Sequence, residues 1–250
     1  MGLGIRSWLR RHGIESPMRP DYRADGLGVN GKNISALTEN TFATAYDEAL
    51  RLNLEGWSGS VPDVRWRAHV CCWAARNALS LRGDFVECGV HTGLLSLTVA
   101  RFLDFAKLDR TLWLFDTFEG IPLERVSTEE KTHAKELNAA VYFDCYDLAR
   151  RNFAPYPNAR LVRGILTESL DEPKIDQIAY LSIDLNNAVP EIATINRLWP
   201  KLSPGAIVVL DDYAFTGYEN QFHAWNQFAQ SKGHMILTVP TGQGILIKPS

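Results

Sequence analysis

The sequence predicts an α/β fold, a doubly wound and mostly parallel sheet of seven strands with helices on both faces. Short aliphatic runs such as 178–183 and 206–210 are typical of strands that are buried on both faces. From residue 85 onward these runs alternate with segments of helical periodicity, as right-handed crossover connections require. Two short apolar runs flank the turn at 240–244 and predict a C-terminal antiparallel hairpin.

The individual elements follow from local pattern, in chain order. Residues 14–38 are rich in Gly, Pro, Asn and Asp, and they predict a loop or arm. The basic, amphipathic segment 5–11 predicts a solvated terminal helix, and the polar stretch 124–139 predicts a lid or an irregular helix. The other expected helices span 38–54, 64–81, 94–103, 146–153, 190–202 and 219–231, with Gly83 and 203–205 as stop signals. The expected strands span 85–88, 111–115, 160–162, 178–183, 206–210, 235–239 and 245–248.

Composition limits the classes of protein to consider. The 250 residues are 46% hydrophobic and 22% charged, with a net charge of −3, and no basic stripe marks a nucleic-acid partner. No apolar run reaches membrane-spanning length, and no cleavable leader is recognisable. The four cysteines lack metal-binding spacing and predict a reducing, cytoplasmic setting. We expect an N-terminal arm and helical cap (1–60) before a catalytic domain (61–250), and a homodimer is one arrangement that such an arm allows.

Three carboxylates follow two of the expected buried strands. The strand 180–183 runs into Asp184, and the strand 206–210 runs into Asp211 and Asp212. In open α/β sheets, ligands bind beyond the carboxyl ends of the strands. Acids that converge there repel one another unless a positive charge joins them, and a divalent metal is the simplest such charge. A single Asp is more often a cap or a turn residue, but three acids at two strand ends favour a site.

A glycine turn follows the first expected strand. Gly89 and Gly93 allow the backbone to approach a ligand closely between the strand 85–88 and the helix 94–103. The spacing differs from the three-glycine dinucleotide fingerprint, which argues against a pyrophosphate ligand. Glu87 beside the turn would repel a phosphate and favour an ammonium or sulfonium ligand.

Two further turns complete the expected cofactor site. Asp116 ends the strand 111–115, where an acid accepts hydrogen bonds from the hydroxyls of a ribose. The alternative is an Asp that only turns the chain into Thr117. After the third strand, Gly164 and Ile165 form a backbone turn able to hold an adenine edge.

Together, these residues resemble class I S-adenosylmethionine-dependent methyltransferases, and most closely the macrocin-O-methyltransferase (TylF-type) group of metal-dependent sugar methyltransferases. The matching stretches are 83–90 (GDFVECGV), 113–122 (WLFDTFEGIP), 181–184 (LSID) and 201–213 (KLSPGAIVVLDDY), within a similarity that covers 64–249. The resemblance implies a Rossmann-like methyltransferase fold. It also implies that Glu87, Gly89 and Asp116 contact the methyl donor S-adenosylmethionine. We expect the turn residues Gly93, Thr117, Gly164 and Ile165 to complete this cofactor site. A further implication is that Asp184, Asp211 and Asp212 bind magnesium or a similar hard cation.

One position departs from the sugar methyltransferases. In that group a second acid lies two residues after the strand-end Asp and is thought to deprotonate the substrate, but this chain has Asn186 there. An amide is not a base, although it can orient a hydroxyl. We therefore expect Asp184 and Asn186 to be the catalytic residues and leave the proton acceptor open, with His91 and His223 as weak candidates.

The leading hypothesis is an O-methyltransferase that acts on a small hydroxylated molecule, a sugar or glycan terminus. A nicotinamide-dependent sugar-modifying oxidoreductase would share the fold type but would require the missing glycine fingerprint. A methyltransferase-like fold kept as a non-catalytic binding module is the third option, with Asn186 as the sign of lost chemistry.

Overall fold

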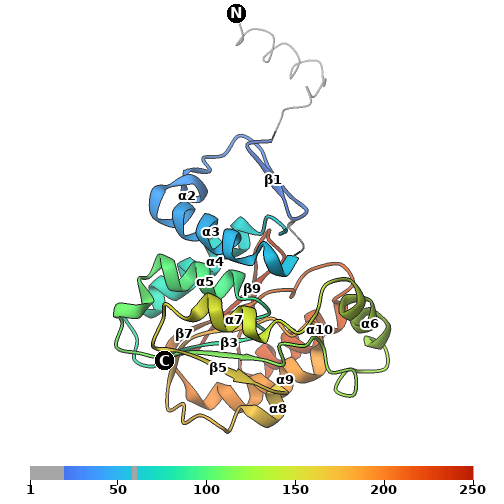
Figure 1. Ribbon diagram of the computed structural model, residues 1–250. Coiled ribbons are helices and arrows are strands. Elements are labelled where there is room, and N and C mark those ends of the chain that lie inside the picture. Colours follow the sequence, from blue (N-terminus) through green and yellow to red (C-terminus); the bar gives the residue numbers. More distant parts are fainter. Residues whose placement is uncertain (1–19, 58–60, 250) are drawn as a thin grey trace, which may run out of the picture.

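The computed structural model describes residues 20–57 and 61–249 and contains the expected doubly wound fold (Figure 1). Seven strands form one sheet in the order β5-β4-β3-β6-β7-β9-β8. The first five of these are parallel, and in the closing hairpin β9 pairs antiparallel with β7 while β8 pairs antiparallel with β9 at the edge. The strand bounds are β3 Asp84–Cys88, β4 Leu112–Asp116, β5 Ala159–Arg163, β6 Ile178–Ile183, β7 Leu202–Leu210, β8 Leu237–Thr238 and β9 Gly244–Ile247. The segment 5–11 lies outside the described residues.

Helices cover both faces of the sheet, because each buried strand presents alternate side chains to opposite sides. On β6, Tyr180 belongs to the core cluster beneath α4, α5 and α7, whereas Leu181 belongs to the cluster beneath α8, α9 and α10. The helix bounds are α2 Ser35–Thr38, α3 Asn40–Asn53, α4 Arg65–Ala78, α5 Leu94–Phe102, α6 Lys131–Ala140, α7 Tyr146–Phe153, α8 Leu166–Ser169, α9 Ala188–Leu198 and α10 Glu219–Ser231. Short 3-10 turns span Glu55–Trp57, Phe105–Lys107 and Trp199–Lys201.

The pairing register aligns the ends of the central strands. Cys88 on β3 lies opposite Phe115 on β4 and Ile183 on β6, and Ile183 in turn lies opposite Leu210 on β7. The residues after Cys88, Ile183 and Leu210 therefore leave the sheet at the same level, next to Asp116, the last residue of β4. This alignment places the glycine turn and the strand-end acids along one edge of the sheet.

The N-terminal region differs from the expected loop at 14–38, because part of it is a β-hairpin. Strands β1 (Tyr22–Ala24) and β2 (Leu27–Val29) pair across Asp25 and Gly26, whose φ angles of 51° and 70° suit a two-residue hairpin turn. The Asp-Gly pair is the sequence signal for this turn. The hairpin packs on α4 through an edge-to-face contact between Tyr22 and Trp66.

The helices that follow the hairpin share the core of the sheet. Buried residues of α3, such as Phe42 and Tyr46, belong to the same hydrophobic cluster as Ala68 of α4 and Leu97 of α5. Helices on both sides of residue 60 therefore contribute to one core. The expected division into an N-terminal arm (1–60) and a catalytic domain (61–250) stays a prediction. Another difference concerns β7, which begins at Leu202 and so includes the Pro204-Gly205 pair expected to precede it.

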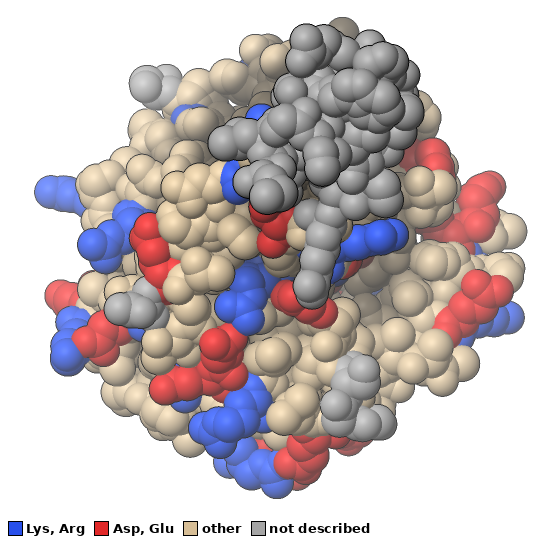
Figure 2. Space-filling view, turned by 90° about the horizontal axis from the view of Figure 1, so that it is seen from above, with Lys and Arg blue, Asp and Glu red and all other residues tan. Residues whose placement is uncertain are grey.

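Two further observations concern the surface charge and the apolar character of the helices. On the face shown in Figure 2, acidic and basic side chains are interspersed. Within residues 20–57 and 61–249, no helix combines the length and the apolar character needed to cross a bilayer.

A buried carboxylate joins α9 to α10. Glu191, which is 3% exposed, accepts hydrogen bonds from the indole Nε1 of Trp225 at 2.6 Å, from Gln221 at 2.8 Å and from the backbone N–H of Leu185 at 3.2 Å. Burial raises the pKa of Glu191 to about 8, although the three N–H donors oppose this shift. The carboxyl group thus reaches from the helical layer to the residue after Asp184.

This raised pKa predicts a pH-dependent stability. The folded chain retains a proton on Glu191 that the unfolded chain releases near its ordinary pKa of about 4.3. The stabilisation that the protonated Glu191 gives the folded state is therefore complete below that value, and it is lost as the pH rises through about 8. We expect Glu191→Gln to remove up to about 1.4 kcal/mol per pH unit from the slope of unfolding free energy against pH. Urea denaturation from pH 5 to pH 8 measures the slope, with Glu172→Gln as the exposed control; equal slopes in all three proteins would contradict the assignment.

Candidate functional site

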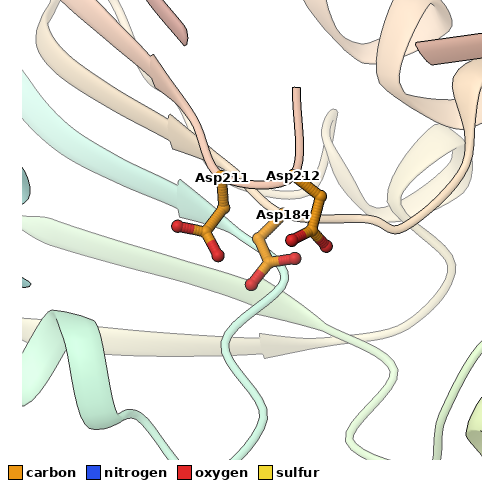
Figure 3. A group of neighbouring side chains, drawn as sticks. All are labelled: Asp184, Asp211 and Asp212. Carbon is orange, nitrogen blue, oxygen red and sulfur yellow. The ribbon is translucent and has the colours of Figure 1, made fainter. Parts of the chain in front are cut away.

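Three carboxylates converge at the carboxyl ends of two neighbouring strands (Figure 3). Asp184 follows β6, and Asp211 and Asp212 follow β7. One oxygen from each lies within 4.8 Å of the others, and the three groups point toward the same space beyond the sheet. The arrangement is the one expected from the sequence.

Two of the three acids have raised pKa values. Burial and the charges of Asp211 and Asp212 raise the pKa of Asp184 well above its ordinary value. Burial and the charge of Asp211 raise the pKa of Asp212 to about 7. Carboxylates in this state favour any cation that reaches them, because a cation relieves both the repulsion and the loss of hydration.

Two side chains outside the triad hold Asp211. Gln243 donates from Nε2 to Asp211 Oδ1 at 2.8 Å, and the Nη1 of Arg67 forms an ion pair with Oδ2. The same Nη1 lies 3.7 Å from an oxygen of Asp212. Gln243 stands at the C-terminal hairpin turn, and Arg67 stands on α4, so elements remote in the chain meet here.

The donor set suits a hard divalent cation. Magnesium prefers oxygen ligands at about 2.1 Å, so two oxygens on one ion are at most about 4.2 Å apart. The triad, with spacings up to 4.8 Å, would need only a small contraction to reach that geometry. Three carboxylates against the single charge of Arg67 also leave an excess of negative charge that a divalent ion would offset.

Asn186 lies against the triad and is fully hydrogen-bonded. Its Nδ2 donates to Asp184 Oδ1 at 3.1 Å and to the Tyr142 hydroxyl at 3.0 Å, and its Oδ1 accepts from the Tyr218 hydroxyl at 3.0 Å. Its φ of 59° lies in the left-handed region, which asparagine tolerates better than most residues. Asn186 therefore fixes one oxygen of Asp184 and links it to two tyrosines.

The glycine turn touches the strand that carries Asp184. Gly89 has a φ of 89°, and a Cβ added there would lie 1.8 Å from the carbonyl oxygen of Asp184. Gly93, at a φ of 95°, is the N-cap residue of α5 and faces the ring of Phe153. Close approach of two backbones thus requires glycine at position 89.

Asp116 organises the same turn. Its Oδ2 accepts from the backbone N–H groups of Val90 at 2.6 Å and His91 at 2.7 Å, while Oδ1 accepts from Phe118 at 2.6 Å. The backbone N–H of Gly164 donates to the carbonyl oxygen of Asp116 at 2.9 Å. The carboxylate does turn the chain as the alternative interpretation held, and ribose binding would use its remaining acceptor capacity of about one lone pair.

Most of the expected site residues line one cleft. The cleft wall includes the expected residues Glu87, Gly89, Asp116, Thr117, Ile165, Asp184, Asn186 and Asp211. Three of the expected site residues, Gly93, Gly164 and Asp212, are not part of this wall as the structure describes it. The two glycines shape the backbone of the turns behind it. Glu87 is 4% exposed, and burial raises its pKa to about 8.

Several cleft residues were not predicted as site residues. Apolar and aromatic side chains of distant segments complete the wall, namely Trp57, Pro62, Val64, Phe118, Ile121, Pro122 and Tyr142. Only the folded chain brings them together, since they follow no spacing pattern.

The two candidate proton acceptors occupy different places. His91 lines the cleft, and its ring meets Trp57, Tyr142 and Phe143 edge to face, while its backbone N–H belongs to the Asp116 network. Burial lowers its pKa, which favours the neutral ring. His223 is exposed on α10 beside Phe222 and is not part of the described cleft wall.

Comparison with known proteins places these features in one group. Residues 65–237 match the family model described as macrocin-O-methyltransferase (TylF). Mycinamicin III 3''-O-methyltransferase of Micromonospora griseorubida is 25% identical over 154 residues, 57% of this chain and 60% of that relative. The 8-demethyl-8-(2,3-dimethoxy-alpha-L-rhamnosyl)-tetracenomycin-C 4'-O-methyltransferase of Streptomyces olivaceus is 28% identical over 151 residues, 56% of this chain and 57% of that relative.

The matched region therefore spans somewhat over half the length of these curated relatives. Among solved structures, the O-methyltransferase NovP superposes with a TM-score of 0.67 at 20% identity, covering 84% of this chain and 97% of that one. This likeness confirms the doubly wound fold with its antiparallel end.

The contact between Gly89 and the Asp184 carbonyl generates a prediction. We expect Gly89→Ala to cost roughly 3 kcal/mol or more of unfolding free energy, because it adds a steric overlap to the strain of a positive φ. Gly233→Ala is the matched control, since Gly233 also has a positive φ but faces open space. Its expected cost is about 1–2 kcal/mol. Equal losses for the two variants in urea denaturation would show that the backbones do not touch.

Proposed function

The chain belongs to the macrocin-O-methyltransferase (TylF) family, and we propose that it transfers a methyl group from S-adenosylmethionine to a hydroxyl of a small molecule in a metal-dependent reaction. The observation that carries the proposal is the carboxylate triad beside a glycine turn at the same edge of the sheet. Family membership decides against a nicotinamide-dependent oxidoreductase. The free, buried state of the four cysteines supports a reducing, cytoplasmic setting.

The donor would bind along the glycine turn. The cleft wall there combines the Asp116 carboxylate, the buried Glu87 carboxyl group with its raised pKa, and Gly89, which presents no side chain. The positive charge of a bound sulfonium would favour the ionised form of Glu87. A sulfonium carries positive charge, so this lining suits the donor better than it suits a phosphate. Thr117 and Ile165 extend the same wall toward the expected positions of the ribose and the adenine.

The acceptor would bind where the triad meets the aromatic wall. A divalent ion held by Asp184, Asp211 and Asp212 would supply a Lewis acid that lowers the pKa of an acceptor hydroxyl. Asn186 keeps Asp184 oriented, and the tyrosines bonded to Asn186 narrow the space beside it. Alignment of donor and acceptor is itself a large source of rate, roughly 7–11 kcal/mol at best.

A sugar hydroxyl is the proposed acceptor. The name of the Streptomyces olivaceus relative includes a rhamnosyl group, and the cleft of this chain combines oxygen ligands with apolar walls. Such a wall suits the apolar face of a sugar ring, while the oxygen-rich end suits its hydroxyls. A glycan terminus presents the same chemistry.

Asn186 supports the non-catalytic alternative only in part. It lacks the basicity of the acid that the sugar methyltransferases have at this place. Its hydrogen bond to Asp184 nevertheless preserves a triad that a pure binding module would have no need to keep. Donor binding without turnover of a broad panel of hydroxylated sugars in Mg²⁺ would favour the binding module.

Asp116 generates the first prediction for this function. We expect Asp116→Asn to weaken S-adenosylmethionine binding by roughly 10- to 100-fold, because the variant loses a charged acceptor and sets an amide against backbone donors. Isothermal titration calorimetry with S-adenosylmethionine measures the affinity. Asp147→Asn on the exposed side of α7 is the control and should bind the donor as the wild type does. An unchanged affinity in Asp116→Asn would remove Asp116 from the donor site.

The proposed metal role of Asp184 gives a second prediction. We expect Asp184→Asn to reduce turnover by at least roughly 100-fold in the presence of Mg²⁺ while donor affinity stays within about twofold. Release of S-adenosylhomocysteine, with a sugar from the panel that the wild type methylates, reports turnover, and calorimetry reports donor binding. Asp171→Asn, an exposed acid paired with Arg197, serves as the control. Full activity in Asp184→Asn would end the proposed metal role.

A further inference from the structure

Arg67 occupies an unusual position between two groups of acids. Its side chain is 16% exposed and reaches from α4 to the carboxylate triad. Nη1 contacts Asp211 and lies 3.7 Å from Asp212. On the other side, Nε lies 2.7 Å from Asp25 Oδ2, and Nη2 donates to Asp25 Oδ1 at 3.2 Å.

The two sets of contacts use different nitrogens of one guanidinium. Asp25 takes Nε and Nη2, and the triad takes Nη1, so either set can persist without the other. An arginine this little exposed would be costly to leave without partners, whereas one that keeps its ion pair and hydrogen bond with Asp25 retains compensation for its charge. Arg67 can therefore release the triad and still be paired.

An aromatic ring also packs against the Arg67 guanidinium. The guanidinium lies over the ring of Phe215, with its central carbon 5.3 Å from the ring centroid. Asp25 sits in the hairpin turn, and the hairpin rests on α4 through Tyr22 and Trp66. Among residues 20–57 and 61–249, the ion pairs that link the hairpin turn to the triad run through the side chain of Arg67.

A divalent ion and Arg67 would compete for the same carboxylates. Among the described residues, Arg67 is the one cation that ion pairs place at the triad, and each oxygen of Asp211 already has one partner, Arg67 on Oδ2 and Gln243 on Oδ1. A doubly charged ion next to a guanidinium would be repelled strongly at the low effective dielectric of such a site. Either the ion binds more weakly, or the arginine moves toward Asp25.

We propose that Arg67 and the divalent cation are alternative partners of Asp211 and Asp212, with Asp25 of the hairpin turn holding Arg67 when the ion is bound. The inference rests on the proposed metal site and adds its regulation. The arginine offsets part of the triad's negative charge in the ion-free protein, and the hairpin sets how readily the arginine leaves. Metal affinity is then tuned by the N-terminal hairpin, which contributes no ligand to the ion.

Two variants with opposite expected effects test the proposal. Arg67→Met removes the competing charge, so we expect Mg²⁺ to bind at least roughly tenfold more tightly. Asp25→Asn removes the alternative partner and leaves Arg67 on the triad, so we expect Mg²⁺ to bind several-fold more weakly than in the wild type. Calorimetry with MgCl₂ and electron paramagnetic resonance with MnCl₂, both on donor-free protein, give the affinities. Arg65→Met is the matched control, because Arg65 lies on the same helix but pairs with Asp47.

Thermal unfolding provides a second readout. Without ion, Arg67→Met leaves the triad uncompensated and should melt at a lower temperature than the wild type. Saturating Mg²⁺ should recover this loss in proportion to its binding. Should Arg67→Met not fold, Asp25→Asn still decides the matter, since it retains both the triad and the arginine. Weaker or unchanged Mg²⁺ binding in a folded Arg67→Met, or unchanged binding in Asp25→Asn, overturns the proposal.

The outcomes separate this inference from the proposed function. Opposite shifts in Mg²⁺ affinity without any methyl transfer by the wild type would uphold the inference and refute the proposed activity. Methyl transfer that needs no divalent ion, together with no Mg²⁺ binding in any variant, would overturn the inference and leave an O-methyltransferase of another mechanism.

Discussion

The repulsion among three carboxylates, one buried and two half-buried, is the constraint around which this cleft is organised. Asp184, Asp211 and Asp212 leave the sheet at one level because the strand register aligns their positions. Acids so close together require compensation, and the chain supplies it with hydrogen bonds from Gln243 and Asn186 and with the charge of Arg67. Elements from the N-terminal hairpin to the C-terminal hairpin converge on this one requirement.

The fold was predictable from the sequence where pattern and burial coincide. The strand β6 and the helices α7 and α10 begin and end where their patterns indicate, because apolar periodicity there reflects burial on the faces that pack. The expected loop at 14–38 was wrong in part, since a hairpin of three-residue strands is too short for periodicity to reveal. Its Asp-Gly turn was the readable signal.

The site was predictable as far as it depends on strand ends. The triad, Asp116 and the glycine turn follow from the rule that ligands bind beyond the carboxyl ends of parallel strands. The partners of these residues did not follow, because Arg67 meets Asp25 and Asp211 only through tertiary packing across 42 and 144 positions of the chain. Tyr142 and Tyr218 likewise meet at Asn186 from separate segments.

At Gly89 the main chain of the glycine turn lies directly against the main chain of Asp184. This contact joins the proposed donor side of the cleft to the side that carries the triad. Side chains of the aromatic wall such as Trp57 and Ile121 take no part in this contact. For the proposed enzyme, acceptor preference can therefore change in evolution through exchange of Trp57 or Ile121, while the backbone approach that sets the glycine turn beside Asp184 is kept.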